Sequence, residues 1–144
     1  MRPYAHRVLA ALWLTVGVIG LQTACTSDKQ VADGPGMVAL RYTNNLFTGR
    51  YDKARKDHDP SERKVFDSFF AGVDGSSVKA DIKVGKESQD ADHATVVFIG
   101  KICPAKGNAA CVTNSSTNDA KAPFISELVR RDGRWYVTSL ASGR

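Results

Sequence analysis

The sequence predicts an α+β fold in which N-terminal helices pack on a curved antiparallel β-sheet. Three observations carry this prediction. Between positions 37 and 73 the apolar residues recur at intervals of three and four, which is the spacing of a helix face. From Val78 onward apolar and polar residues alternate, which is the spacing of a strand with one wet face. Near the end of the chain, Asp132-Gly133 separates two apolar runs, and this dipeptide favours the two-residue type I′ turn of a β-hairpin.

The helical part is expected to contain two or three helices. Residues 37–48 form the first, with Gly49 as its C-terminal stop, and residues 50–57 add one or two short turns. A later helix begins with Asp59 as N-cap and Pro60 at the first helical position. Its apolar stripe consists of Val65, Phe66, Phe69, Phe70 and Val73. Three phenylalanines on one face predict a large hydrophobic partner surface, since each buried aromatic contributes about 2–3 kcal/mol.

The strands are expected after residue 77. Residues 78–84 alternate and predict a half-exposed strand, and residues 85–92 form a polar connection. Residues 94–103 are apolar on both faces, which is typical of a central strand. A further strand begins at residues 111–113, and residues 114–120 form a flexible connection before the final hairpin.

The hairpin within residues 121–140 has a register set by its turn. The expected opposite pairs are Arg131 with Arg134, Arg130 with Trp135, Val129 with Tyr136, Leu128 with Val137, and Ile125 with Leu140. One face then carries Phe124, Leu128, Trp135 and Val137, and the other carries Ile125, Val129, Tyr136 and Leu140. Because both faces are largely apolar, the hairpin is expected inside the sheet, with helices on at least one side.

Length and composition are those of one globular domain. The chain has 144 residues, of which 42% are apolar and 24% charged. Its formal charge of +5 includes Arg2 and Arg7, and without them 18 Lys and Arg remain against 15 Asp and Glu. No dense basic run is present, so the charge predicts a mixed solvated surface and no nucleic-acid partner.

Residues 1–24 are expected to be a signal peptide. Arg2, His6 and Arg7 give a positive start, and an uncharged, mostly apolar run follows at residues 8–21. A run of this length is shorter than the roughly 20 residues that a membrane-spanning helix needs. Residues 25–36 are polar or small with Gly34-Pro35-Gly36, which indicates a flexible tether.

The segment Leu21-Gln22-Thr23-Ala24-Cys25 resembles the lipobox of bacterial lipoproteins, with Gln22 departing from the family's usual Leu, Val or Ile. The resemblance implies lipidation of Cys25, an acylated N-terminus, and a location on the extracytoplasmic side of the cell membrane. Ordinary secretion is the alternative.

Cys103 and Cys111 remain as an even pair once Cys25 is set aside. In an exported protein such a pair predicts a disulfide, here closing a small loop with about 2–3 kcal/mol of stabilisation. A metal site is disfavoured because two cysteines with no His or third Cys nearby do not make a tetrahedral set.

The order of the elements resembles the NTF2-like superfamily, a cone-shaped fold of helices on a curved sheet. Three stretches carry the resemblance: residues 42–54 with Gly49 between two helices, the helix start at 59–62, and the closing hairpin at 128–137. The resemblance covers roughly residues 36–140 and implies an NTF2-like domain at 37–144. A different α+β roll is the alternative. Enzymes of this superfamily use acids, tyrosines or histidines inside the cone, and none of these carries over residue by residue.

Candidate chemical groups are few. Asp57-His58-Asp59 has a His flanked by carboxylates, which suits a base or a metal ligand, but a solvated turn is the favoured interpretation. Asp90, Asp92 and His93 are interpreted in the same way. Tyr42 and Tyr51 are interpreted as core and boundary aromatics rather than pocket residues. No catalytic residue, metal ligand or cofactor is predicted.

The function predicted is therefore that of an exported, lipid-anchored cell-envelope protein. Its domain is non-catalytic and binds a small apolar ligand or a partner protein. A scaffold component of an envelope or secretion complex is one alternative, and an NTF2-like cavity enzyme of isomerase or dehydratase type is another. A deep cavity with a desolvated Asp or His favours the enzyme, whereas a cavity filled by Phe66, Phe69 and Phe70 favours interaction.

Overall fold

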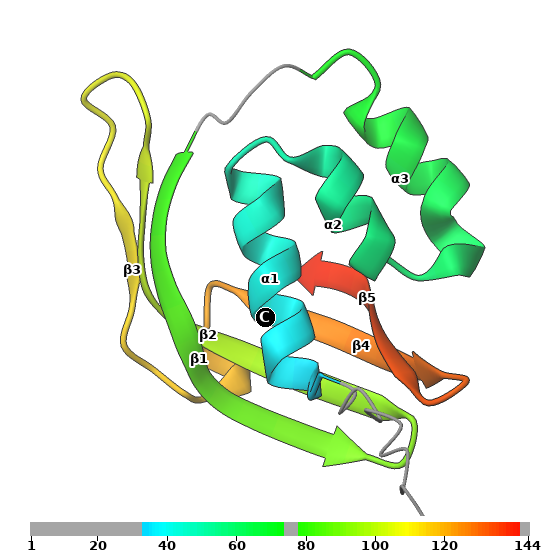
Figure 1. Ribbon diagram of the computed structural model, residues 1–144. Coiled ribbons are helices and arrows are strands. Elements are labelled where there is room, and N and C mark those ends of the chain that lie inside the picture. Colours follow the sequence, from blue (N-terminus) through cyan, green and yellow to red (C-terminus); the bar gives the residue numbers. More distant parts are fainter. Residues whose placement is uncertain (1–32, 74–77, 142–144) are drawn as a thin grey trace, which may run out of the picture. The chain divides into compact units, whose positions relative to one another are not determined.

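Three helices precede a five-stranded antiparallel sheet in the computed structural model, which describes residues 33–73 and 78–141 (Figure 1). The helices are α1 (Pro35–Phe47), α2 (Tyr51–Asp57) and α3 (Arg63–Phe70), with short 3-10 helices η1 (Pro60–Glu62) and η2 (Asp119–Lys121). The strands are β1 (Val78–Asp90), β2 (His93–Pro104), β3 (Val112–Asn114), β4 (Ile125–Arg131) and β5 (Arg134–Ala141). The α+β class is confirmed. The predicted signal peptide and the Cys25 lipidation site lie outside the described residues.

The sheet is open. Its strand order is β1-β2-β4-β5, and β3 pairs with β2 beyond the end of β4. The central position predicted for residues 94–103 is confirmed, because β2 pairs with β1, β3 and β4. This topology leaves β1 and β5 as edge strands, and the NTF2-like cone is not confirmed. None of the described helices is long and apolar enough to cross a membrane.

α2 forms where the sequence predicts it, and α1 begins two residues earlier than predicted, so Pro35 and Gly36 belong to the helix and not to the tether expected at residues 25–36. Pro35 lies in the first turn of α1, where its missing N–H leaves no hydrogen bond unmade. The helix ends before Gly49, whose φ of 69° is in the region that glycine adopts without strain. The chain then continues into α2, and the Arg50 N–H donates to the Asn45 carbonyl across this turn. The two helices are therefore joined by a tight connection.

β1 is longer than the alternation at residues 78–84 predicts. The strand continues to Asp90, with a β-bulge between Val84 and Lys86. A Cβ on Gly85 would lie 2.5 Å from Cγ2 of Ile99, so a larger residue at this bulge would need the Ile99 side chain to shift. The expected polar connection at 85–92 is wrong, because main-chain pairing with β2 continues although the side chains after the bulge are mostly exposed.

The final hairpin keeps its predicted register only near the turn. The four pairs from Arg131–Arg134 to Leu128–Val137 are confirmed, and a β-bulge then inserts Thr138, so Ile125 lies opposite Ala141 instead of Leu140. Leu140 consequently packs against the main core, and the predicted face shared by Ile125 and Leu140 is wrong. The hairpin is also not interior, since β5 is an edge strand with only an isolated bridge between His58 and Val137 beyond it.

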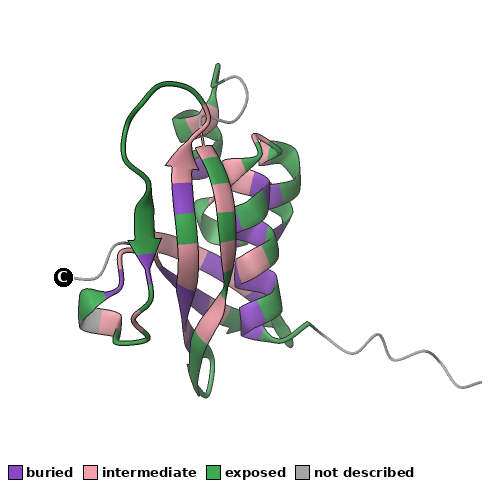
Figure 2. Cartoon of the chain, turned by 90° about the vertical axis from the view of Figure 1, so that its left-hand side faces the viewer, coloured by how far each residue is buried: buried purple, intermediate pink, exposed green. Residues whose placement is uncertain are grey.

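The main core lies between the helices and one face of the sheet, and Figure 2 shows buried residues of the helices turned toward the strands. Its buried members are Val38, Ala39, Tyr42, Ala54, Phe66, Ala94, Val96, Phe98, Leu128, Trp135 and Val137. A smaller cluster of Val97, Ala122 and Ile125 lies on the other face. Of the helices that the structure describes, α1, α2 and α3 do not lie over that second face (Figure 1).

The apolar stripe of α3 is split. Phe66 is buried and Phe70 is half-buried against the main core, but Phe69 is 78% exposed and Val65 is 69% exposed. Val73, just after the helix, is 45% exposed. The large hydrophobic partner surface predicted for the three phenylalanines is supplied by the described residues for Phe66 and Phe70 and not for Phe69.

Cys103 and Cys111 lie at disulfide distance, with their Cα atoms 4.2 Å apart. Cys103 is near the end of β2, and Cys111 immediately precedes β3, whose Val112 pairs with Ile102. The loop between them and β3 itself are mostly exposed (Figure 2). The bond therefore fixes a short, exposed strand that has little burial of its own to hold it.

Candidate functional site

The segment Asp57-His58-Asp59 is buried, so its interpretation as a solvated turn is wrong. The three residues are 3%, 7% and 1% exposed. They connect α2 to η1 and run along the edge of β5, where the Asp59 N–H donates to the Val137 carbonyl. Such a segment is stable in the interior only if each polar side chain has a partner.

Two arginines from distant elements neutralise Asp57. Arg41 of α1 donates from Nε and Nη2 to the two carboxylate oxygens at 2.7 and 2.9 Å, a bidentate pair. Arg134 of β5 donates to Oδ1 at 3.3 Å. Asp57 therefore ties α1 and the hairpin to the end of α2.

Asp59 has a separate partner. Arg131 of β4 donates from Nε and Nη2 to its carboxylate at 2.7 to 3.2 Å, and Ser61 donates from its backbone N–H and its hydroxyl. The Arg131 hydrogen bonds, which outweigh the opposing effect of burial, lower the pKa of Asp59 to about 2. The predicted N-cap role of Asp59 is confirmed, although it caps the 3-10 helix η1.

His58 is enclosed by aromatic rings. Its ring centroid lies 5.8 Å from that of Tyr42 and 4.9 Å from that of Phe66. The Tyr42 hydroxyl lies 3.2 Å from Nδ1, and burial raises the pKa of Tyr42, so this O–H stays protonated and can donate to a neutral imidazole. Burial lowers the pKa of His58, and this effect exceeds the attraction of the Glu62 and Asp59 charges, which raises the pKa.

These contacts give the segment a structural task. Both carboxylates are held by arginines, and the imidazole faces Tyr42 and Phe66 rather than solvent. Within residues 33–73 and 78–141, no group of three or more His, Cys, Asp or Glu is placed to hold a metal ion. The segment links the helices to the hairpin through three side chains.

Stability is expected to decrease as the pH falls below the ordinary histidine value of 6.5. Folding lowers the pKa of His58, so as the pH falls His58 is protonated in the unfolded chain before it is protonated in the folded protein. This uptake favours the unfolded chain, so the free energy of unfolding falls below about pH 6.5. In His58→Gln, the decrease in unfolding free energy between pH 7.5 and 5, measured by urea denaturation, should be smaller than in the unaltered protein. His93→Gln, at an exposed site, is the control, and an unchanged slope in His58→Gln contradicts the assignment.

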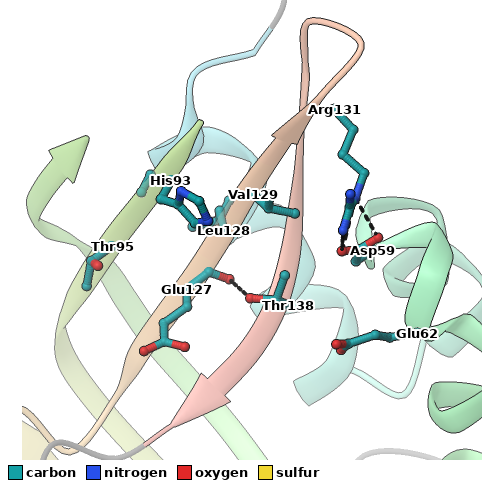
Figure 3. Close-up of a pocket in the computed structure, with 10 residues that line it drawn as sticks. Asp59, Glu62, His93, Thr95, Glu127, Leu128, Val129, Arg131 and Thr138 are labelled. Carbon is teal, nitrogen blue, oxygen red and sulfur yellow. Dashed lines mark hydrogen bonds and ion pairs between the residues drawn. The ribbon is translucent and has the colours of Figure 1, made fainter. Parts of the chain in front are cut away.

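A pocket of about 490 Å³ lies on the sheet face opposite α1, at the side closed by η1 (Figure 3). The register places His93 opposite Val129 and Thr95 opposite Glu127, and Arg131 continues this face along β4. Its lining consists of Asp59, Glu62, His93, Ala94, Thr95, Glu127, Leu128, Val129, Arg131 and Thr138. We call it the open-face pocket.

The bulge in β5 positions one wall of the open-face pocket. The inserted Thr138 donates its hydroxyl to the Glu127 carbonyl at 3.1 Å, and Ser139 donates to the Glu127 carboxylate at 2.9 Å. Glu127 is thereby held at both its backbone and its side chain. Bulges of this kind often re-aim side chains next to binding sites.

The open-face pocket is acidic although the chain is basic overall. Asp59 and Arg131 neutralise each other, which leaves Glu62 and Glu127 as carboxylates that no described Lys, Arg or His pairs with. Figure 3 shows these two side chains on either side of the opening, with Thr138 between them. The arrangement favours a positively charged group with hydrogen-bond donors.

The structure separates the residues singled out in the sequence. His93 and Asp59 line the open-face pocket, whereas Asp90 lines a smaller hollow at the β1–β2 turn. Tyr42 is a core residue, and Tyr51 stacks on Phe70 at 4.6 Å, as predicted for core and boundary aromatics. Glu62, Glu127 and Arg131 were missed. The hairpin register would have placed Glu127 and Arg131 on one face, but their proximity to residues 59–62 depends on the tertiary fold.

Comparisons with known proteins leave the family unassigned. A scan against protein-family models finds no match, and neither does a search of curated proteins. Among solved structures, the chain is similar to a SEC-C motif-containing protein from Rhodopseudomonas palustris, with 17% identity over 74% of this chain and 73% of that one. The TM-score of 0.44 assigns neither a fold family nor a function to this chain.

The identification as an NTF2-like bacterial lipoprotein is therefore corrected. The solved structure that matches carries a SEC-C motif, and none of the three comparisons finds an NTF2-like protein or a lipoprotein. The open sheet agrees with this correction.

Proposed function

We propose that residues 33–141 form a non-catalytic binding domain that acts outside the cytosol and holds a positively charged side chain of a partner protein in the open-face pocket. The observation that carries the proposal is the pair of carboxylates, Glu62 and Glu127, on either side of a pocket of about 490 Å³ in a chain of formal charge +5. Such a local reversal of charge attracts cations and excludes anions.

A partner protein suits this pocket better than a small apolar ligand. The volume is in the range of small-molecule sites, but such sites bury most of the ligand among hydrophobic side chains. Here the lining is rich in charged and hydroxyl groups, and the pocket opens on an uncovered sheet face. An extended segment bearing a lysine or arginine can place that side chain in the pocket while its backbone follows the sheet face.

The buried titratable groups favour binding over catalysis. Asp57 and Asp59 are each held by arginines, and the ring of His58 is enclosed by Tyr42 and Phe66. A general base needs a lone pair that faces a substrate. Phe66 and Phe70 pack between α3 and the rest of the helical layer, whereas Phe69, the third phenylalanine of the expected cavity filling, is exposed.

Action outside the cytosol is supported by two features. Cys103 and Cys111 lie at disulfide distance, and such bonds persist in oxidising compartments. The uncharged run at residues 8–21 after Arg2 and Arg7 has the pattern of an export signal.

The test is a titration of the oxidised, ¹⁵N-labelled protein with the capped pentapeptide Gly-Gly-Lys-Gly-Gly, followed by NMR. Amide shifts are expected at Thr95, Glu127 and Val129, with weak, salt-sensitive binding. The double variant Glu62→Gln, Glu127→Gln should bind about tenfold more weakly.

Asp81→Asn is the matched control, because Asp81 is an exposed carboxylate on β1 outside the pocket. It should bind as the unaltered protein does. Equal binding of Gly-Gly-Glu-Gly-Gly, or shifts that persist in the double variant, would overturn the proposal.

A further inference from the structure

An apolar surface remains uncovered on α3. Val65 and Phe69 lie one helical turn apart and are 69% and 78% exposed, and Val73 follows at 45%. We call these three residues the α3 apolar stripe. Figure 1 shows α3 on the far side of α2 from α1, so the stripe is at the periphery of the helical layer. Apolar side chains that are exposed next to one another, unlike single exposed ones, often mark a site of interaction.

Residues 50–70, which include α2 and α3, carry a net positive charge, although Arg55 is paired with Asp67. Residues 50–70 contain six Lys and Arg against five Asp and Glu. Two of the acids, Asp57 and Asp59, are turned inward and neutralised by arginines from α1, β4 and β5. The solvent-facing charge of α2 and α3 is therefore more positive than the sequence count indicates. Lys64 lies on α3 next to Val65, is exposed, and pairs with no carboxylate among the described residues.

The size of the stripe indicates what it can bind. A stable protein interface buries roughly 800 Å² on each partner, and two valines with one phenylalanine supply only part of that area, so a second copy or a large partner is disfavoured. A bilayer surface has no such requirement. A few inserted apolar side chains with lysines at headgroup level suffice for reversible attachment, and anionic lipid adds to the affinity.

We infer that the α3 apolar stripe is a peripheral docking surface for an anionic phospholipid bilayer. Phe69 and Val65 enter the boundary between headgroups and acyl chains, and Lys64 contacts the lipid phosphates. The open-face pocket lies on the sheet side of the domain and does not include the stripe. The inference is independent of the proposed pocket function and of any modification of Cys25.

The test is sedimentation of the full 144-residue chain with vesicles of phosphatidylcholine and phosphatidylglycerol in a ratio of about three to one. The double variant Val65→Ser, Phe69→Ser should lower the partition coefficient by about tenfold or more. Lys64→Gln should lower it severalfold on anionic vesicles and have little effect on pure phosphatidylcholine.

The matched control is the double variant Met37→Ser, Val112→Ser. These apolar side chains are 62% and 47% exposed, respectively, and neither lies on α3. It should partition as the unaltered chain does, with unfolding midpoints checked for all variants. Binding that persists in the α3 double variant, as attachment through residues 8–21 would produce, overturns the inference.

Discussion

Replacing Arg131 with methionine is expected to lower the free energy of unfolding at pH 7 by more than the same substitution of the neighbouring Arg130 does. Arg131 is half-exposed, but its partner Asp59 has a side chain only 2% exposed. Removing the guanidinium leaves that carboxylate in the interior with Ser61 alone, and an uncompensated buried charge is costly. Urea denaturation of the two proteins measures the difference.

The same variant is expected to change the acid limb of the stability curve. The pKa of Asp59 is lowered to about 2 from an ordinary 3.8, so its contribution is present above about pH 4 and is lost as the pH falls toward 2. Without Arg131 that loss should become smaller. Arg130→Met is the control, since Arg130 lies next in the chain and only stacks over Trp135 at 5.9 Å, worth about 0.5–1 kcal/mol. Equal effects of the two substitutions contradict the role of the Asp59 pair.

Phe98→Ala is expected to destabilise the protein by about 3–5 kcal/mol. Phe98 is fully buried on the central strand β2 and packs in the main core beneath the helices. Truncation loses the free energy gained by burying the ring and leaves a cavity, because the surrounding strands relax only partly into the space. Thermal and urea unfolding both report this loss.

Phe69→Ala is the matched control for that substitution. The residue type and the atoms removed are the same, but Phe69 is 78% exposed on α3, so its truncation should change stability by less than about 0.5 kcal/mol. A large loss in Phe69→Ala would show that the α3 apolar stripe is covered in the folded chain and would also remove the basis for lipid docking.

The α3 helix shows how far a periodic pattern determines burial. Spacings of three and four placed Val65, Phe66, Phe69 and Phe70 on neighbouring parts of one helix surface, and this holds in the structure. The pattern does not indicate which edge of that surface meets α2. Packing put Phe66 and Phe70 inside and left Val65 and Phe69 outside.

Residues 57–59 show why local polarity was misleading. Two carboxylates beside a histidine are typical of a solvated turn, and their burial depends on Arg41, Arg131 and Arg134, which are 16 to 77 residues away in sequence. No local sequence pattern predicts that these three guanidinium groups lie beside residues 57–59. The position of Glu127 in the open-face pocket could not be predicted for a related reason. It depends on the β5 bulge at Thr138, and no turn motif in the sequence indicates that bulge.

The sequence by itself determined the element types, the Asp132-Gly133 turn, the central strand and the pairing of Cys103 with Cys111, because helix periodicity, turn dihedrals and cysteine count are properties of a few neighbouring residues. Only the tertiary structure decided which apolar residues are covered and which charges meet. Burial and ion pairing depend on groups far apart in the chain, and their positions relative to one another exist only once the sheet and the helices have packed.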